Sequence, residues 1–302
     1  MIVGVRSIIV AGALVFLATA CTAVPAAAPA ANSKPGTGGA TSARRTTKPK
    51  PRPRPAPKPA VPHVTVSQVR TADGAVVTVA VFHGPVRYVL HSGSLDPGWA
   101  ATEAGVTAGS AVGGAERKQL LAAFNGGFKL SADAGGYEQE GHVISPLLTG
   151  YASLIIDRSG QARIALWGYG APAPGEAVYS VRQNLQLLVE HGQPTQAAAD
   201  WYSWGATLGG GEDVARSALG QDAAGDLLFA GSMSASPEDM AQALADRGAR
   251  IGMELDINPE WVQLDVAGRP GGPLQADVPG QDRPADQYLW GWSRDFITVL
   301  AG

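Results

Sequence analysis

Residues 226–258 constrain the fold more than any other segment, because they are typical of a strand, a helix and a second strand in direct succession. The apolar run DLLFAG comes first, and SPEDMAQALADRGA follows with the marks of a helix. Ser236 can cap that helix, Pro237 suits its first turn, and Gly248 can end it. The run ARIGMELDIN then begins another strand. This spacing predicts a right-handed crossover between two parallel strands.

Three further segments predict β-hairpins, because each joins two alternating runs through a turn that contains glycine. A helix is predicted in GAERKQLLAAF, where Leu120, Leu121 and Phe124 fall at helical spacing. The fold class that follows is α+β, with mixed or antiparallel sheets, several hairpins and at least one β-α-β crossover. We expect a single domain over residues 63–302. The hairpin segments are VTVSQVRTADGAVVTVAVF, ASLIIDRSGQARIALW and SALGQDAAGDLLFAGS.

The first 62 residues have the composition of an export signal and a linker. A basic start and a short apolar run precede LATAC, which resembles a bacterial lipoprotein signal over residues 1–21 and predicts lipidation of Cys21. A plain signal peptide cleaved nearby is the alternative. Residues 22–62 are rich in Pro, Ala, Lys and Arg and contain no aromatic residue, which predicts a disordered linker. We expect an exported protein, secreted or lipid-anchored at the outer face of the cytoplasmic membrane.

Charge divides sharply between the linker and the domain. Residues 1–62 hold nine of the 23 Lys and Arg residues and none of the 26 Asp and Glu residues, so the domain has a net charge near −12. An acidic domain on a proline-rich basic stalk argues against nucleic acid as a partner. The stalk suits an anionic cell envelope or membrane surface.

Along residues 251–258 every second residue is apolar, and the residues between them are Gly252, Glu254, Asp256 and Asn258. Side chains two apart on a strand share a face, so Glu254 and Asp256 form a candidate pair of catalytic carboxylates near the carboxyl end of the strand. The spacing also matches the start of a Ca²⁺ loop, but Trp261 stands where that loop needs glycine. The sequence therefore predicts no particular metal and no particular cofactor. The two carboxylates on one strand face are nevertheless compatible with a divalent cation.

Other polar stretches are candidates for substrate or phosphate binding. Asn125, Gly126 and Gly127 in LAAFNGGFKL could turn backbone amides toward an anion, or could simply end the predicted helix. Arg216 follows a glycine loop, where it could hold a phosphate or form an ordinary surface ion pair. Arg182 begins the polar triplet RQN, which indicates a strand end or a solvated edge.

The order of these motifs resembles the phosphodiester glycosidase (NAGPA-type) family. That family shows an N-G-G-F turn after a short helix, an R-[ST]-A-[IL]-G strand, a hairpin, a helix and a strand that ends in L-D-G-G-G-S. Here FNGGF, RSALG, the helix over 236–247 and ELD at 254–256 occur in the same order within residues 110–302. The glycine-rich loop after the aspartate is replaced by INPEW, which places phosphate binding by that loop in doubt.

The resemblance implies hydrolysis of a sugar-1-phosphodiester at the anomeric carbon, in an envelope glycan or glycolipid. It casts Asp256 and Glu254 as the carboxylates, and Arg216 with the Asn125–Gly126–Gly127 turn as the phosphate clamp. Arg182 and Asn258 are secondary binding candidates. A non-catalytic lipoprotein that binds a carbohydrate or sugar phosphate in the same pocket is the alternative, and the altered loop favours it.

Overall fold

A computed structural model describes residues 61–205 and 210–302. The predicted signal peptide, Cys21 and nearly all of the linker lie outside the described residues. The described residues fall within one compact unit. Among them, no helix combines the length and the apolar character needed to cross a membrane.

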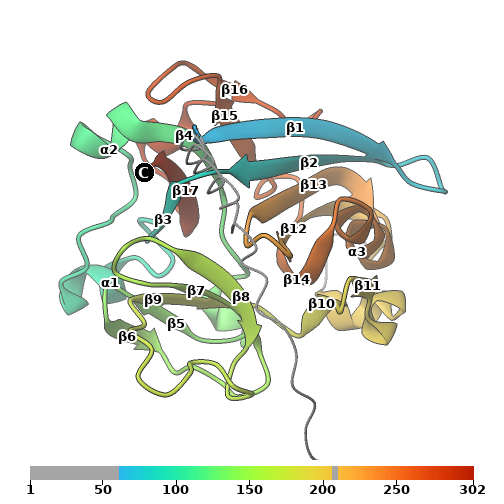
Figure 1. Ribbon diagram of the computed structural model, residues 1–302, viewed down its shortest axis with the longest axis horizontal. Coiled ribbons are helices and arrows are strands. Elements are labelled where there is room, and N and C mark those ends of the chain that lie inside the picture. The colour runs from blue at the N-terminus through green and yellow to red at the C-terminus, as the bar shows by residue number, and fades with distance from the viewer. Residues whose placement is uncertain (1–60, 206–209) are drawn as a thin grey trace, which may run out of the picture. The chain divides into compact units, whose positions relative to one another are not determined.

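The predicted crossover is present. β13 (Leu227–Ala235) leads through α3 (Pro237–Asp246) to β14 (Ala249–Ile257). Between β13 and β14 lies β12 (Val214–Asp222), which is antiparallel to both, so β13 and β14 run parallel to each other. Figure 1 shows α3 beside this part of the sheet, where its apolar side chains pack.

A capping box fixes the start of α3. The Ser236 hydroxyl accepts a hydrogen bond from the Asp239 backbone N–H at 3.1 Å, and the Asp239 carboxylate accepts one from the Ser236 N–H at 3.3 Å. Each bond satisfies a backbone donor near the helix start that has no partner within the helix. The sequence prediction of this helix is confirmed.

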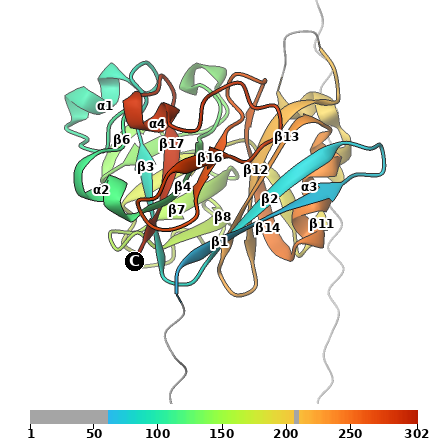
Figure 2. The same cartoon turned by 90° about the horizontal axis from the view of Figure 1, so that it is seen from above.

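The described residues form three antiparallel sheets, and the predicted hairpins β1–β2, β7–β8 and β12–β13 are present. The turn between β1 and β2 projects from the rest of the domain (Figure 2). The seven-stranded sheet has the order β1 (His63–Arg70), β2 (Val76–His83), β13, β12, β14, β10 (Leu187–Glu190) and β11 (Gln193–Pro194). The β4–β17 sheet has the order β16 (Leu274–Ala276), β15 (Leu264–Ala267), β4 (Leu120–Asn125), β17 (Phe296–Ala301) and β3 (Val86–His91). The β7–β9 sheet has the order β6 (His142–Ser145), β5 (Tyr137–Gln139), β9 (Ser180–Gln183), β7 (Ala152–Ile156) and β8 (Ala162–Leu166).

Short helices connect these strands. The described α-helices besides α3 are α1 (Trp99–Ala104), α2 (Gly114–Gln119) and α4 (Gln287–Trp290). The 3₁₀ helices are η1 (Leu130–Ala132), η2 (Gln196–Ala199) and η3 (Trp201–Trp204).

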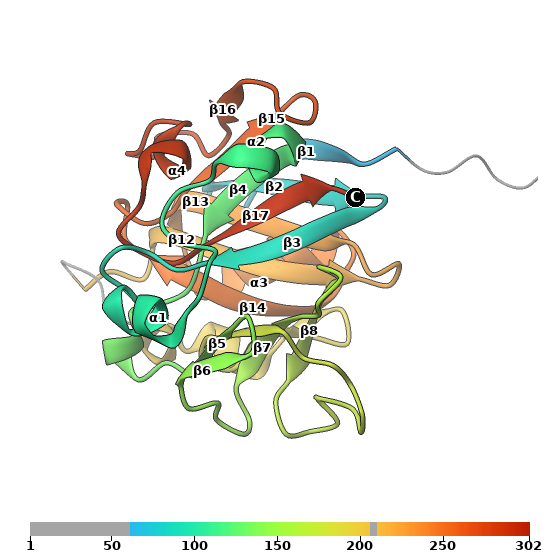
Figure 3. The same cartoon turned by 90° about the vertical axis from the view of Figure 1, so that its left-hand side faces the viewer.

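One predicted helix is wrong in its second half. α2 ends at Gln119, and Leu120–Asn125 forms strand β4, in which every residue is buried. β4 is paired on both sides, with β15 and β17 (Figure 3). A short run that is apolar throughout fits a fully buried strand as well as a buried helix, so its periodicity does not distinguish the two. The N-G-G turn therefore follows a strand.

All three sheets contribute to one apolar core. Phe82 of β2 stacks on Phe124 of β4 at a centroid distance of 5.6 Å, and Phe124 contacts Phe229 of β13 at 5.3 Å. Tyr137 and Leu154 bring the β7–β9 sheet into the same core. The polar residues at the ends of β4, β9 and β14 lie at the edge of this core and form the candidate site.

Candidate active site

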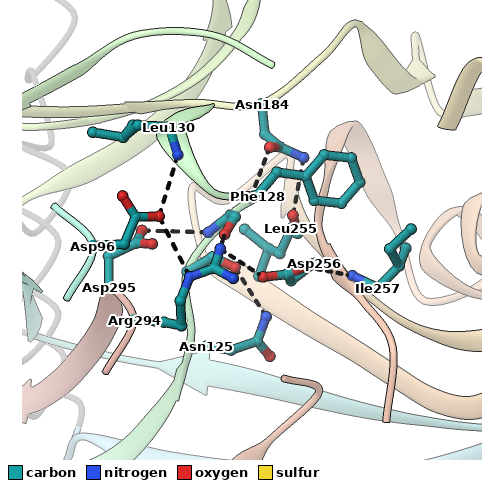
Figure 4. A network of polar contacts seen from close by, with 12 residues as sticks. Asp96, Asn125, Phe128, Leu130, Asn184, Leu255, Asp256, Ile257, Arg294 and Asp295 are labelled. Atoms are coloured by element: carbon teal, nitrogen blue, oxygen red, sulfur yellow. Dashed lines mark hydrogen bonds and ion pairs between the residues drawn. The ribbon is translucent and has the colours of Figure 1, made fainter. Parts of the chain in front are cut away.

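Asp256 lies near the carboxyl end of β14, as predicted, and its carboxyl group lines a cleft. Its Oδ1 accepts a hydrogen bond from the Ile257 N–H at 2.8 Å, and its Oδ2 accepts one from Arg294 Nη2 at 3.1 Å (Figure 4). Only 4% of the residue is exposed. Burial raises the pKa of Asp256 to about 8, and the positive charge of Arg294 offsets only part of this rise. Burial therefore favours the protonated form of this carboxyl group, which is the form that can donate a proton.

Arg294, just before β17, is the cation that contacts Asp256. Its Nη2 also donates to the Gly127 carbonyl at 2.9 Å, and its Nε lies 3.4 Å from Asp96 Oδ2. The guanidinium carbon lies 5.0 Å from the ring centroid of Trp261, a cation–π contact. Sequence reasoning missed Arg294. The available signal was WSRDF, where two charged residues stand directly before the apolar strand FITVL.

The N-G-G turn holds the backbone of Asp256 in place through Ser217. Asn125 Nδ2 donates to Ser217 Oγ at 2.7 Å, and the Ser217 hydroxyl in turn bonds the backbone C=O and N–H of Asp256, both at 3.1 Å. A Cβ on Gly126 would lie 2.0 Å from Asp295 Oδ2, and one on Gly127 would lie 2.9 Å from the Arg182 guanidinium carbon. Close packing therefore requires glycine at both positions.

The amides of the turn are already bonded. Gly126 N–H donates to the Asp295 carbonyl at 2.9 Å, and Gly127 N–H lies 3.3 Å from Asp295 Oδ2. Arg182 forms a buried ion pair with the same carboxylate, Nε to Oδ2 at 2.7 Å, and also donates to the carbonyl of Phe128. Gly126, Gly127 and Arg182, which were predicted to bind substrate or phosphate, thus hold the turn in place. None of the three lines the cleft.

The polar triplet RQN is buried and does not form a solvated edge. Arg182 and Gln183 end β9, and Asn184 follows. Asn184 Oδ1 accepts from the Phe128 N–H at 3.1 Å, while its Nδ2 donates to the backbone carbonyls of Glu254 and Leu255 at 3.1 and 2.9 Å. This side chain joins the N-G-G-F turn to β14.

Glu254 and Arg216 form a second buried ion pair. Arg216 Nη1 lies 2.7 Å from Glu254 Oε1, and the guanidinium also donates to the carbonyls of Trp204 and Ala235. Burial raises the pKa of Glu254 to about 7, with Arg216 acting in the opposite direction. Neither residue is among those that line the cleft. Asn125, Arg216 and Asp256 therefore do not meet around one cleft as a phosphate clamp with its carboxylate would require. Asn125 contacts Asp256 through Ser217, Arg216 pairs with Glu254, and of the three only Asp256 lines the cleft.

The cleft has a volume of about 460 Å³ and unites cationic, aromatic and apolar side chains. Asn258 lines it and adopts a left-handed backbone conformation (φ 79°), which Asn tolerates better than most residues other than glycine. Its carbonyl accepts from the Trp261 N–H at 3.1 Å, so the INPEW segment forms a turn that brings the indole to the cleft wall. The lining residues are Phe128, Lys129, Ser131, Ala132, Ala134, Leu185, Gly205, Asp256, Ile257, Asn258, Trp261 and Arg294.

Two positive charges border the indole. Lys129 is exposed, and its Nζ lies 5.8 Å from the Trp261 ring centroid, while Arg294 lies 5.0 Å from the same centroid. Asp256 is the one carboxyl among the described lining residues. Over residues 61–205 and 210–302, no three His, Cys, Asp or Glu side chains gather in a way that could hold a metal ion. The cleft is thus suited to an anionic ligand that also presents a face for stacking.

No family model and no curated protein matches the chain. Among solved structures, the catalytic domain of zebrafish N-acetylglucosamine-1-phosphodiester α-N-acetylglucosaminidase, auto-inhibited by its pro-peptide, is similar at 13% identity and a TM-score of 0.48. That match covers 82% of this chain and 85% of the zebrafish chain. A hypothetical protein from Synechocystis (15% identity, 82% and 65% coverage, TM-score 0.45) and a putative exported protein from Burkholderia pseudomallei (14%, 75% and 74%, 0.39) are also similar.

Proposed function

We propose that this chain is a hydrolase that cleaves the glycosidic bond of a sugar-1-phosphodiester, with Asp256 as its catalytic acid. The observation that carries the proposal is the position of Asp256, which is 4% exposed, lines the cleft and lies 3.1 Å from a guanidinium that contacts the ring of Trp261. Burial raises the pKa of this carboxyl, which favours its role as an acid. The order of the sequence motifs supports the same reaction.

The cleft provides a place for each part of such a substrate. A phosphodiester carries one negative charge, which Arg294 and Lys129 complement. The sugar ring can contact Trp261 and the apolar wall formed by Phe128 and Ile257. The two cations beside the indole place the phosphate next to the sugar, as the bond to be cleaved requires.

The chemistry then needs one proton donor and one water. Asp256 gives its proton to the phosphate oxygen as the bond between that oxygen and the anomeric carbon breaks. Water attacks the anomeric carbon, and the carboxylate left on Asp256 accepts a proton from it. The products are the free sugar and a phosphomonoester. A phosphomonoester is a good leaving group, so one carboxyl group can serve both steps.

The alternative is a binding protein that holds the same ligand without cleaving it. One observation favours it: the amides of Gly126 and Gly127 are bonded to Asp295, so this turn offers no free backbone donors to a ligand. We place either protein outside the cytoplasm, on the basis of the export signal, with Cys21 as its lipid anchor and the envelope as its setting.

Incubation with chromogenic and UDP-linked sugar-1-phosphodiesters distinguishes the two functions. Release of free sugar that Asp256→Asn abolishes supports the hydrolase. Saturable binding with no release across the set supports the binding protein. Absence of both contradicts the assignment of the cleft to sugar phosphodiesters.

A further inference from the structure

A second hollow adjoins the cleft. It has a volume of about 280 Å³ and shares one wall, Leu185, with the main cleft. All of its described lining residues are uncharged, whereas the main cleft carries Lys129, Arg294 and Asp256. The second hollow is lined by Gly150, Tyr151, Leu185, Gln186 and Ser203.

Leu185 is held in an unfavourable backbone conformation where the two hollows meet. Its φ is 52°, in the left-handed region that leucine rarely adopts. Two hydrogen bonds fix it there: its N–H donates to the Ala134 carbonyl at 2.7 Å, and its carbonyl accepts from the Ala152 N–H at 2.9 Å. Strained residues of this kind persist where surrounding structure over-determines them, and they cluster at ligand sites.

The aromatic wall of the second hollow is also fixed in place. The ring of Tyr151 packs against Gly135, where an added Cβ would lie 3.1 Å from Tyr151 Cδ1 and 2.6 Å from Gln183 Cβ. Gly135 has a φ of 132°, a conformation that other residues rarely adopt. The absence of a side chain at residue 135 thus lets the Tyr151 ring lie close to the backbone.

The chemistry of the second hollow fits a neutral sugar unit. A tyrosine ring offers a stacking face, and the Gln186 carboxamide can both donate and accept hydrogen bonds. The Ser203 hydroxyl donates to Asp200 Oδ2 at 2.7 Å and so offers a sugar an acceptor. None of these residues is a cation that could pair with a second phosphate. The sugar end of the ligand, and not its phosphate end, is therefore the part that fits the second hollow.

We infer that the second hollow binds a second, neutral sugar unit, beyond the one whose anomeric carbon carries the phosphodiester. The substrate is then a glycan of at least two sugar units linked to phosphate, and Leu185 separates the two subsites. This inference rests on the proposed function for the identity of the ligand and deepens it.

The test compares ligands of two lengths. Mono- and disaccharide 1-(phenyl phosphates) built from glucose, N-acetylglucosamine and mannose are titrated into the protein by calorimetry and are also assayed for hydrolysis. We expect a disaccharide ligand to bind about tenfold more tightly than its monosaccharide, a difference of about 1.4 kcal/mol. Gln186→Ala combined with Tyr151→Ala should remove this gain and leave the monosaccharide affinity unchanged.

A matched variant controls for surface effects. Gln193 is exposed on β11 and lines neither hollow, so Gln193→Ala should keep the tenfold gain. Unchanged monosaccharide binding in the double variant shows that the fold is intact, and Gln186→Ala alone, at an exposed position, should lose part of the gain.

The outcomes separate the two proposals. Hydrolysis of monosaccharide ligands with no gain for any disaccharide overturns the second subsite and leaves the hydrolase proposal standing. Tighter disaccharide binding without hydrolysis of any ligand supports the subsite and contradicts the hydrolase. A gain that persists in the double variant, or no binding across the whole set, overturns the subsite.

Discussion

Arg294 Nη2 lies 3.1 Å from Asp256 Oδ2, although the two residues are 38 positions apart in the chain. Asp256 lies near the end of β14 in the seven-stranded sheet, whereas Arg294 lies two residues before β17 of the β4–β17 sheet. The carboxyl is buried deeply enough that its pKa stays near 8 beside a guanidinium. A site of this kind can give up a proton at neutral pH while it binds an anion.

Asp256→Asn should lower kcat for a sugar-1-phosphodiester by about 10²- to 10⁴-fold, the range that a general acid contributes. The amide has nearly the shape of the carboxyl but only one acceptor oxygen, so it loses one of the two contacts with the Ile257 N–H and Arg294, and turnover is compared at a temperature where the variant is folded. Asp265→Asn is a matched control, because burial also raises the pKa of Asp265 to about 8 but Asp265 does not line the cleft. Loss of turnover in both variants would count against a specific role for Asp256.

Arg294→Gln should lower kcat/KM by about 10- to 100-fold, because it removes a charge-assisted contact with the phosphate. It should also move the alkaline limb of the pH–rate profile above its position near pH 8. Arg294 favours the carboxylate form of Asp256, so its removal raises the pKa of that carboxyl and keeps the proton to higher pH. The control is Arg283→Gln, since Arg283 stacks on Trp292 at 5.1 Å but lies outside the cleft. An unshifted profile in Arg294→Gln would contradict the coupling.

Glu254→Gln should destabilise the protein without abolishing hydrolysis. The substitution leaves the buried Arg216 guanidinium without a counter-charge, which costs about 3–5 kcal/mol of unfolding free energy. Urea unfolding at pH 8, above the pKa of about 7 of Glu254, measures the loss where the parent carboxylate is ionised. Turnover is assayed at a temperature where the variant is folded. The exposed pair Arg283–Glu260 provides the comparison, because Glu260→Gln should change stability by no more than about 1 kcal/mol. Complete loss of turnover in folded Glu254→Gln would instead indicate that Glu254 takes part in the chemistry.

Gly126→Ala should destabilise the turn beneath Asp256 by about 1–3 kcal/mol, because the new methyl group overlaps the Asp295 carboxylate. Displacement of Asp295 also disturbs its ion pair with Arg182, so turnover should fall with stability. Gly109→Ala meets no atom within 4 Å and should stay within about 0.5 kcal/mol of the parent. Chemical denaturation of both variants measures the difference, and equal stabilities would refute the packing argument.

The stability of the fold should decrease between pH 5 and pH 8, partly through Asp265. An unfolded aspartate ionises near pH 3.9, whereas the folded Asp265 keeps its proton to about pH 8, so over this interval the unfolded state is favoured as pH rises. The slope for one proton approaches about 1.4 kcal/mol per pH unit. Asp265→Asn removes this contribution, so the stability advantage of the parent over the variant should shrink as pH rises. Urea unfolding of both proteins at pH 5, 6, 7 and 8 gives that difference, which should not be constant.

The local structure of β14 and α3 followed from sequence because their signals are local. Alternation over residues 251–258 predicted the strand, and Ser236 with Pro237 predicted the helix start. The ionic partners of Glu254 and Asp256 are not local. Each contacts an arginine 38 residues away, one earlier in the chain and one later. No short pattern encodes such a pairing, which is why Arg294 was missed.

The buried run of β4 shows the opposite difficulty. LLAAF is apolar throughout, so the helical spacing of its largest side chains does not distinguish a helix from a fully buried strand, and pairing with neighbouring strands decides its conformation. The glycines of the turn after it indicated either an anion-binding turn or the end of a helix. That those glycines serve close packing around Asp295, and leave no amide free for a ligand, depends on contacts that only the folded chain makes.

The place of β17 between β4 and β3 gives the site an order of assembly. Arg294 and Asp295 come after every other contributor to the cleft and its support, so a nascent chain that has emerged only as far as α4 lacks the guanidinium, the anchor of the N-G-G turn and a central strand. The C-terminal strand is therefore the last element along the chain that the candidate site requires.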